Sequence, residues 1–258
     1  MQRKQTPVLQ IPLFSWVHYS LNHKKHPECV LFADYHLAIS SGIKEQLIAK
    51  GVNAARIFTI FNPVSPSNIT ISRPQFNEPK SFIYVGRMKF EGQKMLKNML
   101  DAFAHVEGNW ILHMIGNGSD IKICQDYAVN LGINDQVQWH GWQKSPWEYI
   151  EKNISTVSAF LLTSKFEGLP MTLLEAMSFG IYCVSSDCPS GPADIIQNDI
   201  NGKLYPVGDL AALQAELNEI VGGKTLPSSE QIKSSIEQFY DETYYRNVKQ
   251  YLVNVLNN

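Results

Sequence analysis

Two acidic residues, eight positions apart, bracket a segment of the chain that is suited to binding a phosphate ester. Glu167 lies in the loop KFEGLP, and Glu175 lies one turn inside the helix that the pattern predicts over 171–179. The apolar run before the loop, 159–164, is typical of a buried strand. A loop that joins a strand to a helix lies at the carboxyl edge of an open α/β sheet, where such folds bind ligands.

The start of this predicted helix supplies backbone donors for an anion. We expect the amides of Met171, Thr172 and Leu173 to be free at the helix N-terminus, where the helix dipole favours a pyrophosphate. Gly168, in the loop before the helix, would let the backbone approach a ligand closely. The segment therefore predicts an anion site with neighbouring carboxylates.

The two carboxylates have both a functional and a plainer interpretation, and spacing alone leaves them open. Glu175 is placed to accept hydrogen bonds from vicinal hydroxyls, such as those of a ribose. Thr172 and Glu175 also fit a capping box, which would make the carboxylate part of the helix terminus. Glu167 also fits an ordinary solvated loop residue.

Two basic residues follow another predicted strand, 81–86, and extend the same edge of the sheet. Arg87 comes directly after Gly86, and Lys94 comes seven residues later, near the start of the next predicted helix. A guanidinium fork and an ammonium point charge there would hold a diphosphate leaving group. Ordinary surface charge is the alternative, and Lys89 and Lys97 are rivals for the lysine role.

Two glycine-containing turns and a histidine group give weaker signals. Gly116 lies in IGNGSD, which is incomplete as a dinucleotide motif and also fits a tight turn between a strand and a helix. Gly141 lies in HGW, which would face a nucleobase edge or form an aromatic packing cluster. His18, His23 and His26 lack the cysteine or carboxylate pattern of a zinc site, and His18 alone is considered for a sugar site.

The predicted elements place these motifs on one architecture. Apolar runs and amphipathic stretches alternate from residue 81 onward, which predicts an α/β fold with a mostly parallel, Rossmann-like sheet. The predicted strands are 14–18, 35–40, 57–62, 81–86, 110–116, 137–141, 159–164 and 182–187, and the predicted helices are 26–33, 41–50, 94–106, 119–131, 145–152, 171–179, 209–221 and 229–256.

A Pro-, Ser- and Asn-rich stretch, 63–80, is typical of a linker and divides the chain. We predict a partial N-terminal Rossmann-like domain over 1–70 and a complete nucleotide-sugar-binding domain over 71–240. A C-terminal helix over 241–258 is expected to pack back toward the N-terminal part.

Composition excludes several classes of protein. Hydrophobic residues make up 44% and charged residues 18% of the chain, and the net charge is -2, so we expect a globular protein without a nucleic-acid partner. The four cysteines are scattered, which favours a reduced, cytoplasmic chain. No apolar run reaches the length of a membrane span and no secretory signal is evident, so any membrane contact is expected to be peripheral.

Together these motifs resemble the family-four retaining glycosyltransferases, which have the GT-B fold of two Rossmann-like domains. Glu167 through Glu175 match the family's E-x7-E signature, and Arg87 with Lys94 resembles its phosphate-binding pair. IGNG, HGW and NGKLYPVGD follow in the family's order. The wording of KFEGQK, FEGLPMTLLEAMSFGI, SSDCPSGP and FYDETYY is similar to that of the lipopolysaccharide-core α-1,6-galactosyltransferases of Gram-negative bacteria.

This resemblance implies a hexosyltransferase that moves galactose from UDP-galactose to a glucose 6-hydroxyl of the lipopolysaccharide core at the cytoplasmic face of the inner membrane. It implies no metal or other cofactor. The implied catalytic residues are Glu167, Arg87, Lys94 and His18. The implied nucleotide-sugar-binding residues are Gly86, Arg87, Lys94, Gly116, Gly141, Glu167, Gly168, Met171, Thr172, Leu173 and Glu175.

The sequence departs from the family pattern in three places. Lys94 lies slightly farther from Arg87 than is usual, and Asp194 stands where many members have glutamate. The first domain is about half the family's length and lacks its glycine-rich acceptor-side loop, so we expect an N-terminally shortened chain. An inactive nucleotide-sugar-binding remnant is therefore the alternative function, and a GT-B epimerase or phosphorylase is a third.

Overall fold

The computed structural model describes residues 11–23 and 25–256, and within them the strands form two parallel sheets. The smaller sheet has the order β1 (Phe14–Val17), β2 (Tyr35–Ala38), β3 (Ile57–Thr59). The larger has the order β6-β5-β4-β7-β8-β9, formed by β4 (Lys80–Val85), β5 (Trp110–Ile115), β6 (Val137–Gly141), β7 (Ala159–Leu162), β8 (Cys183–Ser186) and β9 (Gly202–Tyr205). All of its pairs are parallel, so the predicted α/β class with parallel sheets is confirmed.

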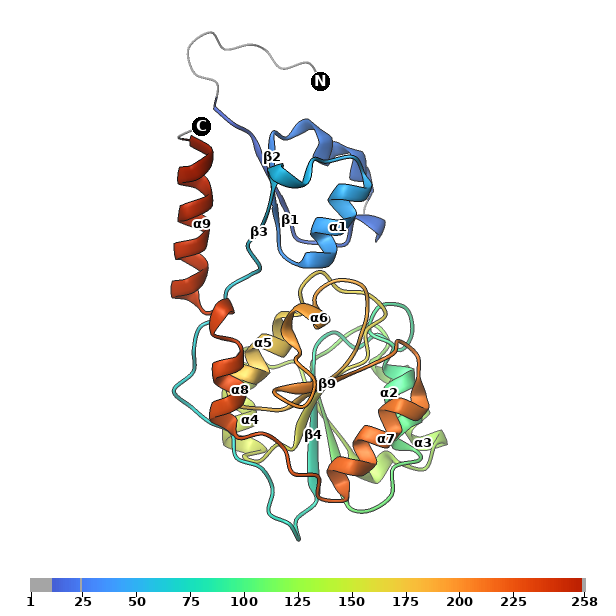
Figure 1. Ribbon diagram of the computed structural model, residues 1–258. Coiled ribbons are helices and arrows are strands. Elements are labelled where there is room, and N and C mark those ends of the chain that lie inside the picture. Colours follow the sequence, from blue (N-terminus) through green and yellow to red (C-terminus); the bar gives the residue numbers. More distant parts are fainter. Residues whose placement is uncertain (1–10, 24, 257–258) are drawn as a thin grey trace.

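Helices cover both faces of the larger sheet (Figure 1). One face carries α2 (Leu96–Phe103), α3 (Ile121–Asn130) and α7 (Leu210–Val221), and the other carries α4 (Pro146–Asn153), α5 (Met171–Ser178) and α8 (Ser229–Ser235), while the short α6 (Pro192–Ile195) lies above the sheet. Every residue of β7 and β8 is buried, as expected for strands covered on both faces. The core beneath α2 contains the aromatic contacts of Phe103 with Phe82 and Trp110.

The smaller sheet is also covered on two sides, and one cover comes from the far end of the chain. Its remaining elements are the helix α1 (Ser41–Ala49), the 3₁₀ helices η1 (Leu21–His23), η2 (Pro27–Phe32) and η3 (Ala54–Arg56), and the C-terminal helix α9 (Asp241–Leu256). Tyr244 of α9 is buried with Leu37 and Ile60, and Tyr251 stacks on Phe58 at 4.9 Å between ring centroids. The C-terminal helix therefore lies beside the first sheet (Figure 1).

The segment that connects the two sheets is hydrogen-bonded to residues that follow or belong to the helices of the larger sheet. Val64 forms a β-bridge with Tyr240, and Ile71 N–H donates to the Phe179 carbonyl at 3.0 Å. The Lys233 ammonium donates to the carbonyls of Ser67 and Ile69 at 3.0 and 2.8 Å. The start of the proline-rich linker, residues 63–71, is therefore held in place by these bonds, and we call it the strap.

Two helix predictions need correction. The predicted helix over 26–33 is the shorter 3₁₀ helix η2, and His26, the residue before η2, adopts a left-handed conformation with φ of 56°. The single helix predicted over 229–256 is broken into α8, the 3₁₀ helix η5 (Glu237–Phe239) and α9. Tyr240 is extended because it bridges Val64 where the chain turns back to the first sheet. No helix within the described residues is long and apolar enough to cross a bilayer.

Candidate functional site

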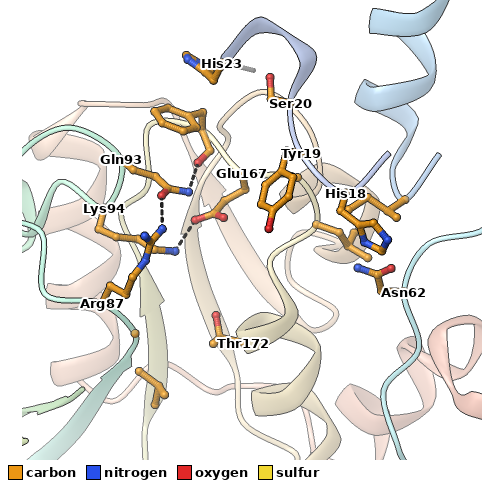
Figure 2. A pocket seen from close by; sticks show the side chains of 16 residues that line it. His18, Tyr19, Ser20, His23, Asn62, Arg87, Gln93, Lys94, Glu167 and Thr172 are labelled. Carbon is orange, nitrogen blue, oxygen red and sulfur yellow. Dashed lines mark hydrogen bonds and ion pairs between the residues drawn. The ribbon is translucent and has the colours of Figure 1, made fainter. Parts of the chain in front are cut away.

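A cavity of about 500 Å³ lies between the two sheets, and both contribute to its lining (Figure 2). Its lining residues follow strands: His18 comes after β1, Ile39 after β2, Asn62 after β3 and Gly86 after β4. The two parallel sheets therefore face each other with their carboxyl edges, which is where ligands bind in such folds. The other lining residues are Tyr19, Ser20, His23, Val85, Arg87, Gln93, Lys94, Phe166, Glu167, Gly168, Leu169 and Thr172.

We call the part of the chain built on β1–β3 the smaller lobe and the part built on β4–β9 the larger lobe. A buried ion pair of the larger lobe lines the cavity. The Lys94 ammonium is 2.6 Å from Oε1 of Glu167, and the two side chains are only 14% and 10% exposed. The Ser164 hydroxyl donates to the same carboxylate oxygen at 2.6 Å. A buried charge is retained only where it is paired and hydrogen-bonded, and Glu167 meets both conditions. The interpretation of Glu167 as a solvated loop residue does not fit this burial.

Arg87 adds a second cation beside this pair. Its guanidinium donates from Nη2 to Oε1 of Gln93 at 2.8 Å (Figure 2). The Tyr84 hydroxyl donates to the Arg87 carbonyl at 2.8 Å, and burial raises the pKa of Tyr84 far above its usual value, so that it remains a neutral donor. Two cations and one carboxylate therefore share the cavity, as the sequence predicts for Arg87, Lys94 and Glu167.

The structure separates the three candidate lysines. Lys89 pairs with Asp120 at 3.4 Å, and Lys97 pairs with Asp101 at 2.7 Å, one turn along its own helix. Lys94 lines the cavity.

The N-terminus of α5 agrees with the prediction only in part. Thr172 lines the cavity, but the Leu173 amide donates to the Pro170 carbonyl at 3.0 Å, and the Leu173 side chain is fully buried. The expectation of a free amide at Leu173 is therefore wrong, because a tight first turn uses that donor. The N-cap is Pro170 and no side chain caps it, so the capping-box interpretation of Thr172 and Glu175 also fails.

Glu175 lies at a second hollow. Its Oε2 accepts a hydrogen bond from the Trp147 indole at 2.8 Å, and this hollow of about 450 Å³ is lined by 63–67 of the strap together with Trp147, Met171, Glu175, Ser178 and Phe179. Glu167 and Arg87 therefore share one cavity, and the structure places Met171 and Glu175 on the neighbouring one. The rotation of α5 about its axis directs Glu175 away from the cavity. The eight-residue spacing of Glu167 and Glu175 does not reveal this rotation.

Two of the predicted glycines, Gly116 and Gly168, allow close contacts between backbone segments. A Cβ at Gly116, where φ is 136°, would lie 1.9 Å from the Gly86 carbonyl oxygen, and the Gly116 amide donates to the Gly141 carbonyl at 2.7 Å. A Cβ at Gly168 would lie 2.7 Å from the His18 carbonyl oxygen. Gly168 thus allows close approach of the two lobes, and Gly116 and Gly141 lie outside the cavity lining.

The two lobes touch at several further points around the cavity. His23 stacks on Phe166 with ring centroids 3.9 Å apart, and the Ser41 amide donates to the Asp194 carboxylate at 3.0 Å. Burial raises the pKa of Asp194 above its ordinary value. The sequence reasoning missed Phe166 and Gln93, although each stands next to a predicted residue, because neither is an ionisable group.

Cys188 and His26 lie outside the lining of the cavity. Burial, assisted by the charge of Glu167, raises the pKa of the Cys188 thiol to about 12, so it stays protonated. His26 pairs with Glu28 on the surface at 3.2 Å. Within 11–23 and 25–256, no group of three or more His, Cys, Asp or Glu side chains could hold a metal ion.

Comparisons with known proteins agree with this architecture. Two curated relatives are lipopolysaccharide 1,6-galactosyltransferases: that of Escherichia coli K12 is 51% identical over 96% of this chain and 69% of its own, and that of Salmonella typhimurium LT2 is 51% identical over 91% of this chain and 66% of its own. The solved apo structure of the lipopolysaccharide outer core galactosyltransferase WaaB matches with a TM-score of 0.91 and 49% identity, over 93% of this chain and 68% of that one.

A more distant solved structure, Anabaena HepE in complex with UDP, matches with a TM-score of 0.80 at 17% identity, over 94% of this chain and 72% of that one, and supports the GT-B fold alone. The chain spans about two thirds of the length of these two galactosyltransferases, 69% and 66%. Residues 68–238 match the family described as glycosyl transferases group 1. The chain therefore belongs to the group 1 glycosyl transferases and has the GT-B fold.

Proposed function

We propose that the chain is a retaining hexosyltransferase that transfers galactose from UDP-galactose to the 6-hydroxyl of a glucose in the lipopolysaccharide core. The observation that carries this proposal is the arrangement of Arg87, Lys94 and Glu167 in one inter-lobe cavity. The 51% identity to two lipopolysaccharide 1,6-galactosyltransferases supports the choice of donor and acceptor.

The residues of the cavity suggest how the transfer proceeds. The acceptor hydroxyl oxygen bonds to the anomeric carbon on the face that the diphosphate leaves, the bond from that carbon to the β-phosphate oxygen breaks, and the hydroxyl proton passes to the departing phosphate. Arg87 and Lys94 stabilise the negative charge that develops on UDP. Fixed charges of this kind, already in place before the reaction, typically contribute about 10²–10³ in rate each.

The other cavity groups orient the substrates. Glu167, held by Lys94 and Ser164, has a second carboxylate oxygen that can accept hydrogen bonds from hydroxyls of the donor sugar. His18 lines the opposite wall, in the lobe where we place the acceptor. Because Arg87 and Lys94 supply the positive charge that a divalent ion would otherwise provide, we propose that transfer needs no metal.

The proposed acceptor implies that the enzyme works at a membrane surface. The lipopolysaccharide core is attached to a lipid, so we propose that the protein works in the cytoplasm and touches the cytoplasmic face of the inner membrane peripherally. Sedimentation with vesicles of inner-membrane lipids tests this contact, and a protein that stays in the supernatant with and without acceptor contradicts it.

The decisive experiment measures transfer of labelled galactose from UDP-galactose to lipopolysaccharide whose core lacks this residue. Activity that resists a chelator and is abolished by Arg87→Ala supports the proposal, with Arg246→Ala on the exposed surface of α9 as the matched control. Binding of UDP without any transfer would instead identify an inactive nucleotide-sugar-binding chain. Interconversion of UDP-sugars without acceptor would identify an epimerase.

A further inference from the structure

Gln93, a neutral residue at the edge of the cavity, connects the two loops that carry the charged groups. Its side-chain Oε1 accepts from Arg87 Nη2 at 2.8 Å, and its Nε2 donates to the Phe166 carbonyl at 3.3 Å (Figure 2). Its main-chain carbonyl accepts from the Lys165 amide at 2.8 Å. We propose that Gln93 is a positioning residue that fixes the Arg87 guanidinium and the Glu167 loop in one arrangement before the donor binds.

The amide chemistry of Gln93 suits this role. Arg87 is an exposed residue with a long side chain, so holding one rotamer costs conformational entropy unless a partner fixes it. An amide oxygen fixes the guanidinium without neutralising it, which leaves the full positive charge for a diphosphate. The amide nitrogen meets the Phe166 carbonyl at the same time, and a carboxylate in this place would have no proton to donate to it.

The bridge also reaches the opposite lobe. The Phe166 ring, whose main chain Gln93 holds, stacks on His23 with an angle of 21° between the ring planes. Lys94, the next residue after Gln93, pairs with Glu167, the next residue after Phe166. Gln93 and Lys94 thus form two adjacent ties between the same two loops, one neutral and one charged.

The inference rests on the proposed function, because turnover is measured as galactose transfer. The test therefore also measures UDP binding, which does not depend on transfer. The variants are Gln93→Ala, Gln93→Glu and, as a matched control, Gln250→Ala, which removes an exposed glutamine hydrogen-bonded to Asn254 on α9. For each variant, calorimetry gives the Kd of UDP, the galactose-transfer assay gives kcat and the KM of UDP-galactose, and thermal unfolding gives Tm.

We expect Gln93→Ala to lower kcat by up to about 10²-fold, as small misplacements at a reacting centre do. We expect it to raise the Kd of UDP about tenfold, and Gln93→Glu to raise it further, because a carboxylate pairs with Arg87 and adds negative charge beside the diphosphate. Tm should stay near that of Gln250→Ala. A Kd and kcat for Gln93→Ala equal to those of Gln250→Ala would overturn the inference.

Equal weakening of UDP binding in both Gln93 variants, with a matching loss of Tm, would also overturn it, because that pattern indicates a structural role only. If the wild-type protein binds UDP but transfers no galactose, the proposed function fails, while the order of the three Kd values still decides the role of Gln93.

Discussion

Replacing Lys94 with methionine tests the central ion pair directly. Methionine keeps most of the side-chain volume and removes the charge, leaving the Glu167 side chain, which is 10% exposed, with the Ser164 hydroxyl as its remaining close partner. Breaking a buried pair by removing one member typically costs 3–5 kcal/mol of stability, because the other charge stays buried. The hydrogen bond from Ser164 offsets part of this, so we expect a loss of about 3 kcal/mol in the free energy of unfolding.

The double variant Lys94→Met, Glu167→Gln removes both charges and should recover most of that loss. Replacing a buried pair as a whole is often close to neutral. In thermal unfolding, a chain of this size shifts by about 2–4 °C per kcal/mol, so Lys94→Met should lower Tm by about 6–12 °C. The double variant should lie within a few degrees of wild type.

The assay is a double-mutant cycle measured by urea unfolding and by thermal unfolding at neutral pH, with both single variants included. A loss below about 1 kcal/mol for Lys94→Met, the value of an exposed pair, would refute the claim that the pair is desolvated. Additive losses in the double variant would refute the claim that the two side chains interact.

Three further predictions concern the rest of the molecule. Gly168→Ala brings a Cβ to within 2.7 Å of the His18 carbonyl oxygen, so the lobes must shift, and we expect a loss of about 1–3 kcal/mol together with a raised KM in the transfer assay. Tyr244→Ala removes a buried ring between α9 and the first sheet and should cost about 3–5 kcal/mol in urea unfolding. Burial, with a smaller effect of His140, lowers the pKa of His113 to about 4. The unfolded state then binds the proton first, so stability falls by about 3 kcal/mol as pH drops from about 6.5 to 4, and His113→Leu should flatten this part of the curve.

The meeting of Arg87, Lys94 and Glu167 could be predicted from the sequence because it depends on topology. Arg87 follows one strand and Glu167 follows another, and all strands of a parallel sheet end at the same edge. This reasoning needs only the alternation of strands and helices, which the apolar runs show clearly. The shared edge also explains why Lys94 and Glu167 form an ion pair although 73 positions of sequence separate them.

The positions of Leu173 and Glu175 could not be predicted in the same way. Whether an amide is free depends on how tightly the first turn of α5 closes on Pro170, and the direction of Glu175 depends on the rotation of α5 about its axis. Glu175 accepts a hydrogen bond from Trp147, and the end of α5 accepts one from Ile71 of the linker; both partners are distant in sequence. The break between α8 and α9 at Tyr240 was not predicted for a similar reason. The amphipathic pattern continues through Tyr240, but the bridge to Val64 turns the chain back toward the first sheet.

Two glycines decide how closely the lobes meet: Gly42, which the sequence reasoning missed, and Gly168, which it expected to approach a ligand rather than the other lobe. A Cβ at Gly42 would lie 2.7 Å from Cα of Ser190, so the backbone at the start of α1 directly contacts the loop before α6. Gly168 makes the same kind of contact with the His18 carbonyl, and the Ser190 hydroxyl donates to the neighbouring Glu167 carbonyl at 2.7 Å. Any larger side chain at either place would separate the lobes by the space it needs. Because the cavity draws its cations from one lobe and His18 from the other, that separation changes the distance between the groups that we assign to donor and acceptor. Small residues at the lobe contacts are therefore as much a condition of the proposed transfer as the charged residues that the sequence makes conspicuous.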